Sequence, residues 1–420
     1  MNRPIRVRAS SNPYANPELF RFVGSMEGLV DETEIADTPE EKTARTGWRE
    51  RGHELFGAAG LLMPGIGIAI GLATIGSFSA MGIGSYAFDG AAVPVSPILI
   101  AILAGLLIRN TVGVPAIYEL GLALCLKRVL RIGVALLGIR LSLLAAGATG
   151  LVAVPIALAC IATALLLVRW MSRLVGLPPR LGTLIAVGTA ICGNTAIVAT
   201  GPVIDADKDE VSYAVACITL FGLVALIAHP FIAHALFSGD GHLAGLFLGA
   251  AIHDTAQVAG AGLLYAQQFG DSTALESATV TKLVRNMFMV GVIPMVAAIH
   301  HRTKDAEART QGGAPTPSFG QLVPFFVFGF VAMALLRTVG DLGAQPFGIL
   351  EPDTWARLIE GTSALSTFCL TIAMATVGLG TNLRRLQNLG LKPLGVGLAA
   401  AVIVGTVSAV MISVLAPTLG

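Results

Sequence analysis

Long apolar stretches separated by short charged segments make up the chain from residue 55 onward. Runs without Asp, Glu, Lys or Arg extend over 55–88, 90–108, 141–168, 181–204, 211–239, 310–336, 361–383 and 393–420. Apolar segments with internal charges lie near 126–147, 242–264 and 278–299. Each is long enough for the about 20 residues of a transmembrane helix. Membrane strands are excluded because the runs lack alternation of polar and apolar residues. The pattern predicts an all-α polytopic membrane protein with about eleven transmembrane helices.

The composition supports a membrane protein and excludes other classes. Hydrophobic residues make up 54% of the chain and charged residues 13%, whereas about a quarter of the residues of a soluble domain are charged. A soluble enzyme and a disordered protein are therefore excluded. The net charge of +1 gives no reason to expect nucleic acid as a partner. The chain has no Walker motif, so we do not expect it to drive transport with ATP by itself.

Basic and acidic loops alternate along the chain, which predicts its orientation. Basic residues gather in Arg109 to Arg131, Arg169 to Arg180, Arg302 to Arg309 and Arg384 to Lys392. The intervening loops are acidic or neutral and include Asp89, Asp205 to Glu210, Asp271 and Asp341 to Asp353. Since cytoplasmic loops carry the excess of Lys and Arg, eleven spans place the N-terminus in the cytoplasm and the C-terminus outside. Cysteine labelling is expected to find residue 304 in the cytoplasm and residue 345 outside.

Two further features concern the whole chain. Residues 1–54 are polar and charged, so we expect a cytoplasmic extension, either solvated or regulatory, ahead of a transmembrane domain over 55–420. The five cysteines lie in or beside apolar runs without a CxxC pair, and we expect buried free thiols and no metal site. They are Cys125, Cys160, Cys192, Cys217 and Cys369.

Polar residues inside apolar spans mark candidate functional sites, because they are costly in a bilayer. The first cluster interrupts the span 181–204 and contains Gly188, Thr189, Cys192, Gly193, Asn194 and Thr195. Glycines and hydrogen-bonding side chains at mid-span predict a discontinuous helix whose second half presents its N-terminus to an anionic substrate. The alternative is a packing face of small residues.

A second cluster lies in the middle of the span 242–264. His253 and Asp254 are adjacent, and Thr255 and Gln257 follow. A carboxylate at this depth takes up a proton, pairs with a cation or binds one, so His253 and Asp254 are candidates for ion coupling and Gln257 for substrate binding. A structural role is the alternative. Segment 188–199 resembles 249–259, either through shared ancestry or through similar chemistry.

Two more groups of polar residues are candidates. Lys282 and Arg285 lie three residues apart on one helix face, where they either extend to the interface or pair with Asp254 or a substrate anion. Arg140 follows Gly138, and Thr381 and Asn382 follow Gly378, in two segments of similar sequence. We interpret Arg140 as a coupling residue and Thr381 and Asn382 as substrate ligands.

The similarity of 135–144 to 375–386 predicts inverted repeats, and a second pairing of the spans is also possible. The predicted topology makes 135–144 and 375–386 run in opposite directions, which is typical of inverted repeats in transporters. A second pairing sets spans 2–6 against spans 7–11 and matches a discontinuous helix at 188–195 with another at 376–382. The sequence alone does not choose between the two pairings.

Several motifs together resemble a known family. They are GTAICGNTAIVATGPVIDADKDEVSYAVACITLFG, GAAIHDTAQVAGAG, TKLVRN, RIGVALLGIRLSL and AMATVGLGTNL. Over roughly residues 57–415 the chain resembles the YeiH-type (UPF0324-like) bacterial inner-membrane proteins, commonly called sulfate exporters. The resemblance implies kinship with sodium/proton antiporters and bile-acid symporters, with a core domain that moves against a panel domain. The chain departs from the family at His253-Asp254, where His-Glu is usual, and at Asn194-Thr195, where a small residue and Ser are usual.

The leading hypothesis is a secondary transporter of the bacterial inner membrane. It would export a small anion, such as sulfate, sulfite or a short organic sulfonate or acid, by alternating access coupled to protons or sodium. We expect no other cofactor, and the sequence is compatible with a homodimer. The alternatives are a passive anion channel, a membrane sensor that uses residues 1–54, and an intramembrane enzyme that uses His253 and Asp254. Because no second catalytic cluster is present, we do not expect an enzyme.

Overall fold

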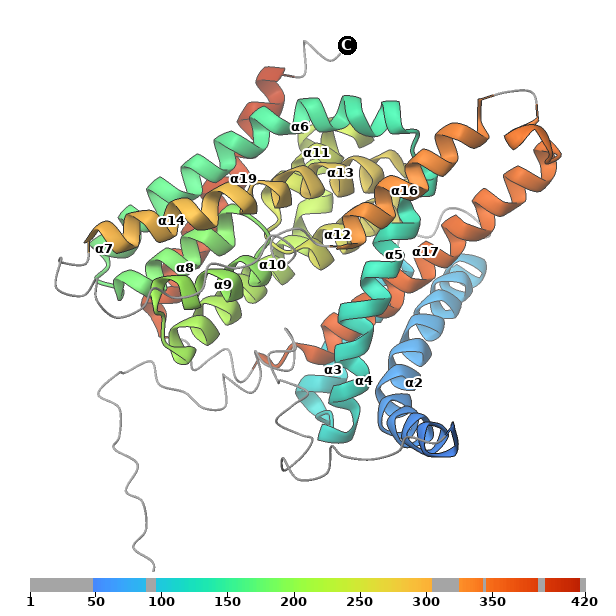
Figure 1. The fold of residues 1–420 in the computed structure, drawn as a ribbon, viewed down its shortest axis with the longest axis horizontal. Helices are drawn as coiled ribbons and strands as arrows, with labels where there is room; N and C mark the ends of the chain where they lie inside the picture. Colours follow the sequence, from blue (N-terminus) through green and yellow to red (C-terminus); the bar gives the residue numbers. More distant parts are fainter. Residues whose placement is uncertain (1–47, 88–95, 304–324, 343–344, 384–389, 416–420) are drawn as a thin grey trace, which may run out of the picture.

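A computed structural model shows an arrangement of helices (Figure 1). It describes residues 48–87, 96–303, 325–342, 345–383 and 390–415. The longer helices are α2 (Trp48–Ala87), α3 (Pro97–Thr111), α4 (Glu119–Leu124), α5 (Leu130–Leu137), α6 (Leu143–Thr163), α7 (Arg169–Leu174), α8 (Pro179–Ala190), α9 (Asn194–Thr200), α10 (Lys208–Leu236), α11 (Gly241–Ala251), α12 (Thr255–Phe269), α13 (Thr273–Met287), α14 (Met289–Thr303), α16 (Phe325–Gly340), α17 (Pro352–Gly380) and α19 (Leu391–Leu415). Helix α2 begins seven residues before the expected boundary at residue 55. The rest of the predicted N-terminal extension, residues 1–47, lies outside the described residues.

Short segments of other helical geometry join several of these helices. The π-helical turns η2 (Cys125–Val129) and η4 (Ala164–Val168) connect α4 to α5 and α6 to α7 without a break. The 3-10 turn η3 (Gly138–Arg140) ends α5, and Ser142 then begins α6 by accepting a hydrogen bond from the Ala145 N–H. Side-chain oxygens thus satisfy backbone donors where a new helix starts.

Six helical segments of the described residues are long and apolar enough to cross a membrane. They are Gly60–Ala80, Leu143–Leu174, Lys208–Leu236, Thr273–His300, Pro352–Gly380 and Leu391–Leu415. Shorter apolar helices accompany them, and no strand occurs in the described residues. The prediction of an all-α polytopic membrane protein is confirmed. The five cysteines are free and buried, as expected.

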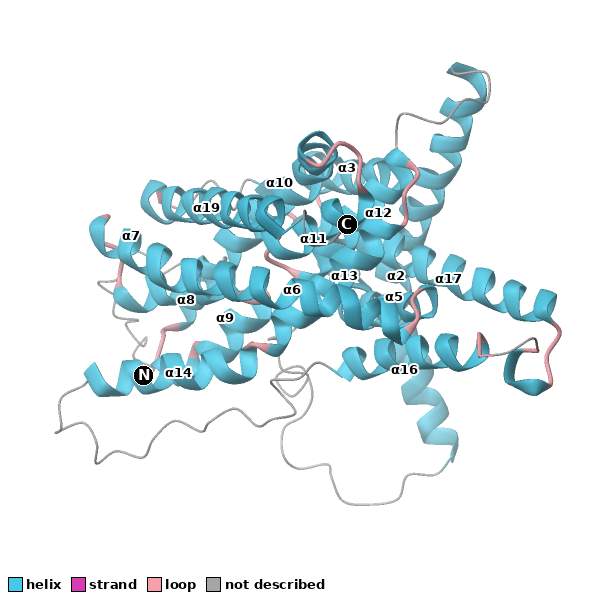
Figure 2. Cartoon of the chain, turned by 90° about the horizontal axis from the view of Figure 1, so that it is seen from above, coloured by secondary structure: helices cyan, strands magenta, loops and turns pink. Residues whose placement is uncertain are grey.

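The helices form two groups that lie side by side in both ribbon views (Figures 1 and 2). The larger hydrophobic cluster joins residues of α5, α6, α8 to α14 and α19. The smaller cluster joins α2, α3, α4 and α17 through residues such as Ala69, Ala101, Leu122 and Ala375. Helices α3 and α17 contribute residues to both clusters, and α5 packs on α17, so these helices lie where the two groups meet.

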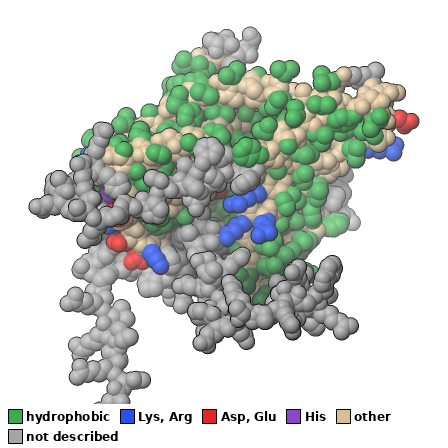
Figure 3. Space-filling view, in the orientation of Figure 1, with side chains coloured by type: hydrophobic (Ala, Val, Ile, Leu, Met, Phe, Trp, Pro, Cys, Tyr) green, Lys and Arg blue, Asp and Glu red, His purple; other side chains and the backbone are tan. Residues whose placement is uncertain are grey.

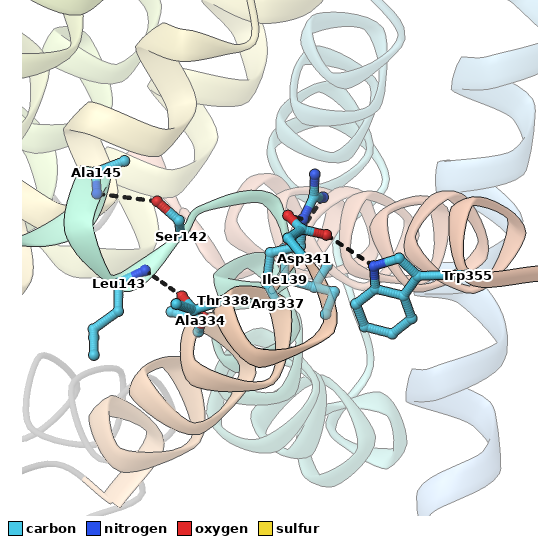
Figure 4. A network of polar contacts seen from close by, with 9 residues as sticks. All are labelled: Ile139, Ser142, Leu143, Ala145, Ala334, Arg337, Thr338, Asp341 and Trp355. Atoms are coloured by element: carbon cyan, nitrogen blue, oxygen red, sulfur yellow. Dashed lines mark hydrogen bonds and ion pairs between the residues drawn. The ribbon is translucent and has the colours of Figure 1, made fainter. Parts of the chain in front are cut away.

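Helix α17 starts at a polar corner beside the end of α16 (Figure 4). The Asp341 carboxylate accepts hydrogen bonds from Arg337 Nε at 2.5 Å and from Trp355 Nε1 at 2.9 Å. Partial burial raises the pKa of Asp341, but these hydrogen bonds outweigh burial and hold that pKa below its usual value. The corner ties the end of α16 to the first turn of α17.

Helix α11 packs along α13 in the same direction. A Cβ atom added at Gly245 would lie 2.6 Å from the Ala274 carbonyl oxygen, and one added at Gly249 would lie 2.6 Å from that of Ala278. The two helices therefore run parallel to each other. Glycine allows this close approach because it has no side chain.

Helix α12 packs on the same α13 but runs the opposite way. The Asn286 side chain, near the end of α13, donates to Thr255 Oγ1 at the start of α12. Farther along α12, Gly262 packs against Leu275 near the start of α13. Since α11 is parallel and α12 antiparallel to α13, the two form a re-entrant hairpin with its tip at residues 252–254.

Helices α8 and α9 form a second re-entrant hairpin. Asn194, at the start of α9, donates to Thr219 Oγ1, whereas Gly201 at its end packs against Val211 near the start of α10. Helix α9 thus runs back toward the start of α10, which we name the Lys208 end of the bundle. The tip lies at residues 191–193.

Helix α8 also begins at the Lys208 end. Gly182, in its first turn, packs against Ser172 of α7, and the neighbouring Arg180 interacts electrostatically with Glu210 in the first turn of α10. Near its other end, Gly188 packs against Ile197 of α9. The hairpin therefore enters and leaves the bundle at the same end.

The two hairpins enter from opposite ends of the bundle. Both ends of the α11–α12 hairpin lie where α10 finishes: the rings of His234 and Phe269 stack at 3.8 Å, and Gly241 packs against Asp271. We name this the Gly241 end. Each hairpin is followed by a long helix, α10 or α13, so two modules of the same order point in opposite directions. The similarity of 188–199 to 249–259 corresponds to this inverted relation.

These findings correct three expectations from the sequence. The segments 181–204 and 242–264 return to the end where they entered and are not spans, so the prediction of eleven crossings is wrong for these two. The acidic loop 205–210 consequently lies at the same end as Arg173 and Arg180, not opposite them. The interruption expected around Gly378 also lies elsewhere, because α17 is helical through Gly380 and becomes extended only at Thr381.

Candidate functional site

The two hairpin tips leave backbone groups without partners inside their own helices. At the first tip, Ile191 has φ −119° and ψ −95°, and Gly193 has φ 65° and ψ −121°. At the second tip, Ile252 and Asp254 are extended. A helix that stops in this way exposes its last carbonyl oxygens. The carbonyls at the ends of α8 and α11 therefore need donors from elsewhere.

Lys282 and Arg285 of α13 supply these donors. Lys282 Nζ donates to the carbonyls of Ile191 at 2.9 Å and Ile252 at 3.0 Å, and also to that of His253. An ammonium group has three hydrogens, so all of them are used.

Arg285 binds the same two helix ends. Its Nε donates to the Ala190 carbonyl at 2.8 Å and its Nη2 to that of Thr189, both in α8. Its Nη1 donates to the carbonyls of Ala250 at 2.5 Å and Ile252 at 3.3 Å. Positive charge at a helix C-terminus is also favourable for the helix dipole.

Both cations are fully buried, with 0% of their surface exposed. Neither side chain extends to the membrane–water interface, so the interpretation that these two residues reach toward that interface is excluded. They do not line the cavity described below, so their predicted contact with a substrate does not fit this arrangement. Their observed role is to hold the tips of both hairpins against α13.

Asp254 takes the complementary position at the start of a helix. Its Oδ1 accepts a hydrogen bond of 2.8 Å from the Ala256 N–H and so caps α12. The other hairpin also reaches it, because a Cβ atom at Gly193 would lie 3.3 Å from Asp254 Oδ2. The carboxylate thus lies beside the N-terminal ends of both α12 and α9, where negative charge is favourable.

A cavity of about 130 Å³ lies between the hairpin tips and helices α5, α16 and α17. A water molecule needs about 10–15 Å³ of such volume, so the cavity has room for several waters or a small ion. Its walls are formed by Leu126, Lys127, Leu130, Arg131, Val134, Cys192, Asn194, Thr195, Thr219, Asp254, Thr255, Ala256, Gln257, Asn286, Phe326 and Val377.

Hydrogen bonds hold the polar side chains of this wall in place. Asn194 donates to Thr219 Oγ1 at 3.2 Å, and Gln257 Nε2 donates to the Thr219 carbonyl at 3.2 Å. Asn286 Nδ2 donates to Thr255 Oγ1 at 3.2 Å. The oxygens Gln257 Oε1 and Asn286 Oδ1 are buried and have no hydrogen-bond partner. The wall therefore offers hydroxyl groups and two unused acceptor oxygens beside a carboxylate.

The structure brings together five of the residues predicted for the site: Cys192, Asn194, Thr195, Asp254 and Gln257 line the cavity. Gly193 forms the turn behind it. Thr189 and His253 are buried outside the lining, and neither ring nitrogen of His253 has a hydrogen-bond partner.

The remaining predicted residues lie elsewhere. Arg140 Nη2 donates to Thr367 Oγ1 at 2.9 Å, on the contact between η3 and α17. Thr381 donates to the Val377 carbonyl, and its own carbonyl accepts from Asn110. Asn382 follows α17 and is not part of the lining. No group of three His, Cys, Asp or Glu residues able to hold a metal ion occurs in the part of the chain that the structure describes.

Sequence reasoning missed four polar residues of the lining. Thr219 and Asn286 are polar positions in apolar helices, the signal that identified the others. Lys127 and Arg131 were counted only as loop charges, although η2 and α5 carry them into the cavity wall. Arg131 is exposed and Lys127 half-buried, and Figure 3 shows Lys and Arg side chains gathered where α5 lies. The cavity thus combines one carboxylate with two basic groups.

Comparisons with known proteins show similarity to membrane proteins. The profile of the family described as conserved hypothetical protein 698 matches residues 67–397. A UPF0324 membrane protein of Agrobacterium fabrum is 33% identical over 312 residues, which cover 74% of this chain and 82% of that protein. UPF0324 membrane proteins of Fusobacterium nucleatum and Streptococcus agalactiae are 30% and 31% identical, over 72% and 73% of this chain and 85% of each relative. No solved structure matches the chain.

Proposed function

The chain belongs to the UPF0324 family of membrane proteins, and we propose that this membrane protein is a secondary transporter that exports a small anion by alternating access. The observation that carries the proposal is the polar cavity at the meeting point of two opposed hairpins. Transporters commonly bind their substrates where broken helices end inside the membrane. A multi-pass membrane protein with such a cavity has the features needed to bind a solute between the two sides.

The chemistry of the cavity favours an anion of modest size. Lys127 and Arg131 provide positive charge, and Thr195 and Thr255 provide hydroxyl donors. Sulfate, sulfite or a short organic sulfonate or acid fits a cavity that has room for several water molecules. We propose that the coupling ion, a proton or sodium, acts at Asp254.

The predicted orientation supports export from the cytoplasm. The basic segment from Arg109 to Arg131 is predicted to be cytoplasmic by the positive-inside rule, and its last residues line the cavity. We therefore propose an inner-membrane protein, with its N-terminus in the cytoplasm and its C-terminus outside, whose cavity opens inward in this conformation. Both hairpins return to their own side, so this orientation is the same for residues after 270 as in the eleven-span prediction.

An enzymatic role has less support. His253 is buried outside the cavity, so it does not meet a molecule that binds there together with Asp254. We propose that the chain is not an enzyme. A passive channel would give flux that neither saturates nor depends on a coupling gradient.

Flux measurements in proteoliposomes test the proposal. We expect saturable uptake or release of labelled sulfate or methanesulfonate that responds to an imposed pH or sodium gradient. Asn194→Ala is expected to weaken anion binding by about 1–3 kcal/mol, roughly 5- to 150-fold, since its removal leaves a buried partner unsatisfied. Asn382→Ala is the control, because this asparagine lies outside the cavity. Flux without saturation would indicate a channel, and equal effects of the two variants would exclude the cavity as the binding site.

A further inference from the structure

An anion in the cavity meets the carboxylate of Asp254 directly. Asp254 lines the same wall as Asn194 and Thr195 and lies against the turn at Gly193. Like charges at such short range repel each other strongly where water is largely excluded. An anion therefore binds well only if the charge of Asp254 is removed by a proton or balanced by a cation.

The backbone groups around Asp254 are poorly suited to a metal cation. Sites for hard cations are built from several oxygen ligands, often including backbone carbonyls. The freed carbonyls at the two tips are instead bound by Lys282 and Arg285. Toward Asp254 the hairpins present N–H groups, such as that of Ala256. The tips thus favour an anionic group and do not favour sodium.

The same wall holds an acceptor for a protonated carboxyl group. Asn286 Oδ1 is buried without a hydrogen-bond partner, and the Asn286 side chain is held by its hydrogen bond to Thr255, the residue after Asp254. A carboxylic acid has one O–H donor that a carboxylate lacks. A protonated Asp254 would therefore add one donor to a wall that holds two buried acceptor oxygens without a partner, Gln257 Oε1 and Asn286 Oδ1.

We propose that Asp254 takes up one proton as the anion binds, so that sulfate is carried with one proton and one net negative charge, which an inside-negative membrane potential drives outward. This rests on the proposed function and names its coupling ion. The proton comes from cavity water, the carboxylate becomes a neutral carboxyl group, and one anion binds for each proton removed from solution. Lys127 and Arg131 then face the anion without an opposing negative charge, which suits a dianion such as sulfate.

The charged and titratable groups near Asp254 come from several elements. Lys282 of α13 interacts with it electrostatically, and Lys127 and Arg131 face it from η2 and α5 across the cavity. His253 is its neighbour in the hairpin tip. Helices α9, α16 and α17 contribute only uncharged residues to the lining. Asp254 is thus the lining residue that gains a proton most directly, and His253 is the group that must be tested against it.

Proton uptake on anion binding tests the inference. Purified protein in weakly buffered solution with a pH-indicator dye is mixed with sulfate or methanesulfonate, which keep their charge across the accessible pH range. We expect about one proton taken up per bound anion, and an affinity that falls by up to tenfold per pH unit where Asp254 ionises. Asp254→Asn is expected to bind the anion without proton uptake and without this pH dependence. Asp254→Glu, which keeps a carboxyl group, is expected to retain uptake.

The outcomes separate this inference from the proposed function. Anion binding without proton uptake, or binding that requires sodium, would overturn the inference and leave the transporter in place. Loss of uptake in His253→Gln, with uptake retained in Asp254→Asn, would overturn it by moving the proton to the imidazole. If neither anion binds, the proposed function fails and the inference fails with it. The wild-type measurement decides whether a proton accompanies the anion, and the Asp254 and His253 variants assign that proton to one of the two groups.

Discussion

The two hairpins have similar sequences and the same shape, but their tips are built differently. In both hairpins, carbonyl groups at the end of the first helix accept hydrogen bonds from the same two cations, Lys282 and Arg285. They differ at the residue before the second helix: Gly193 precedes α9 and has no side chain, whereas Asp254 precedes α12 and caps it. The first tip therefore leaves the N-terminal end of α9 without a side-chain cap. The second tip contributes the Asp254 carboxylate, which lies beside the N-terminal ends of both α9 and α12.

This difference shows how a repeated module becomes a functional site. The shared part, the carbonyl ends held by α13, fixes the position of both tips. The part that differs, Gly193 against Asp254, gives the cavity one carboxylate instead of two that would repel each other.

Site-directed labelling tests whether the hairpins are re-entrant, with an all-or-none result. In a cysteine-free background, Val175→Cys and Lys208→Cys flank the first hairpin, and Ser238→Cys and Ser272→Cys flank the second. We expect the first two to react from one side of the membrane and the last two from the other side. If Val175→Cys and Lys208→Cys react from opposite sides, α8 and α9 cross the membrane and the comparison fails.

Removing the shared cation is expected to destabilise both tips. Lys282→Met removes the donor of the Ile191 and His253 carbonyls and one of the two donors of the Ile252 carbonyl. Each buried carbonyl left without a donor costs about 1–3 kcal/mol, so we expect a loss of about 2–6 kcal/mol. The free energy of unfolding, from titration with SDS, measures this loss. The matched control is Lys127→Met, a half-buried lysine of the cavity wall, for which we expect less than about 1 kcal/mol. Similar losses in both variants would contradict the role assigned to Lys282.

The turn at Gly193 should tolerate a side chain poorly. Its φ of 65° with ψ of −121° is a conformation that only glycine adopts readily, so Gly193→Ala is expected to cost about 2–3 kcal/mol. Gly270→Ala is the comparison, because Gly270 has φ 76° and ψ 8° with no atom near an added Cβ. There we expect about 1 kcal/mol. Equal losses would show that the contact with Asp254 and the unusual ψ do not matter.

The smallest effect is expected at the polar corner of Asp341, far from the tips. Its pKa is lower in the folded protein than in the unfolded chain, so its contribution to stability is complete above the unfolded value of about 4 and decreases as the pH falls through the folded pKa. Because the pair with Arg337 is exposed, we expect Asp341→Asn to cost less than about 1 kcal/mol at neutral pH. Unfolding measured from neutral to acid pH should show less acid dependence in the variant; an unchanged profile would contradict this.

The sequence identified the polar positions of the site because burial in a membrane makes such residues conspicuous. Asn194, Asp254 and Gln257 were found in this way. It did not reveal whether an interrupted apolar segment crosses or returns, since both need the same composition and only contacts with α10 and α13 decide it. It also showed the charge of Lys282 and Arg285 without showing that carbonyls would use their hydrogens.

Glycine predicted the local structure least reliably, because it allows both tight turns and close packing of helices. Gly193 does form a turn, as predicted. Gly378 lies in a continuous helix, where a Cβ atom would be 2.3 Å from the Ile102 carbonyl oxygen. Its purpose is close packing of α17 on α3, and this contact between distant segments is not visible in the sequence. The helix therefore does not break at Gly378 and ends at Gly380, within the range 376–382.

The bonds from α13 to both tips have a mechanical consequence. To swing open alone, the first hairpin must give up three hydrogen bonds to charged groups and the second four. At about 1.5–3 kcal/mol for each bond, that is roughly 5–9 kcal/mol even for the first hairpin. The two hairpins and α13 therefore move as one rigid body, without a hinge at the tips. Any large displacement that exposes the cavity to the opposite side has its sliding boundary at the other wall, along α5, α16 and α17.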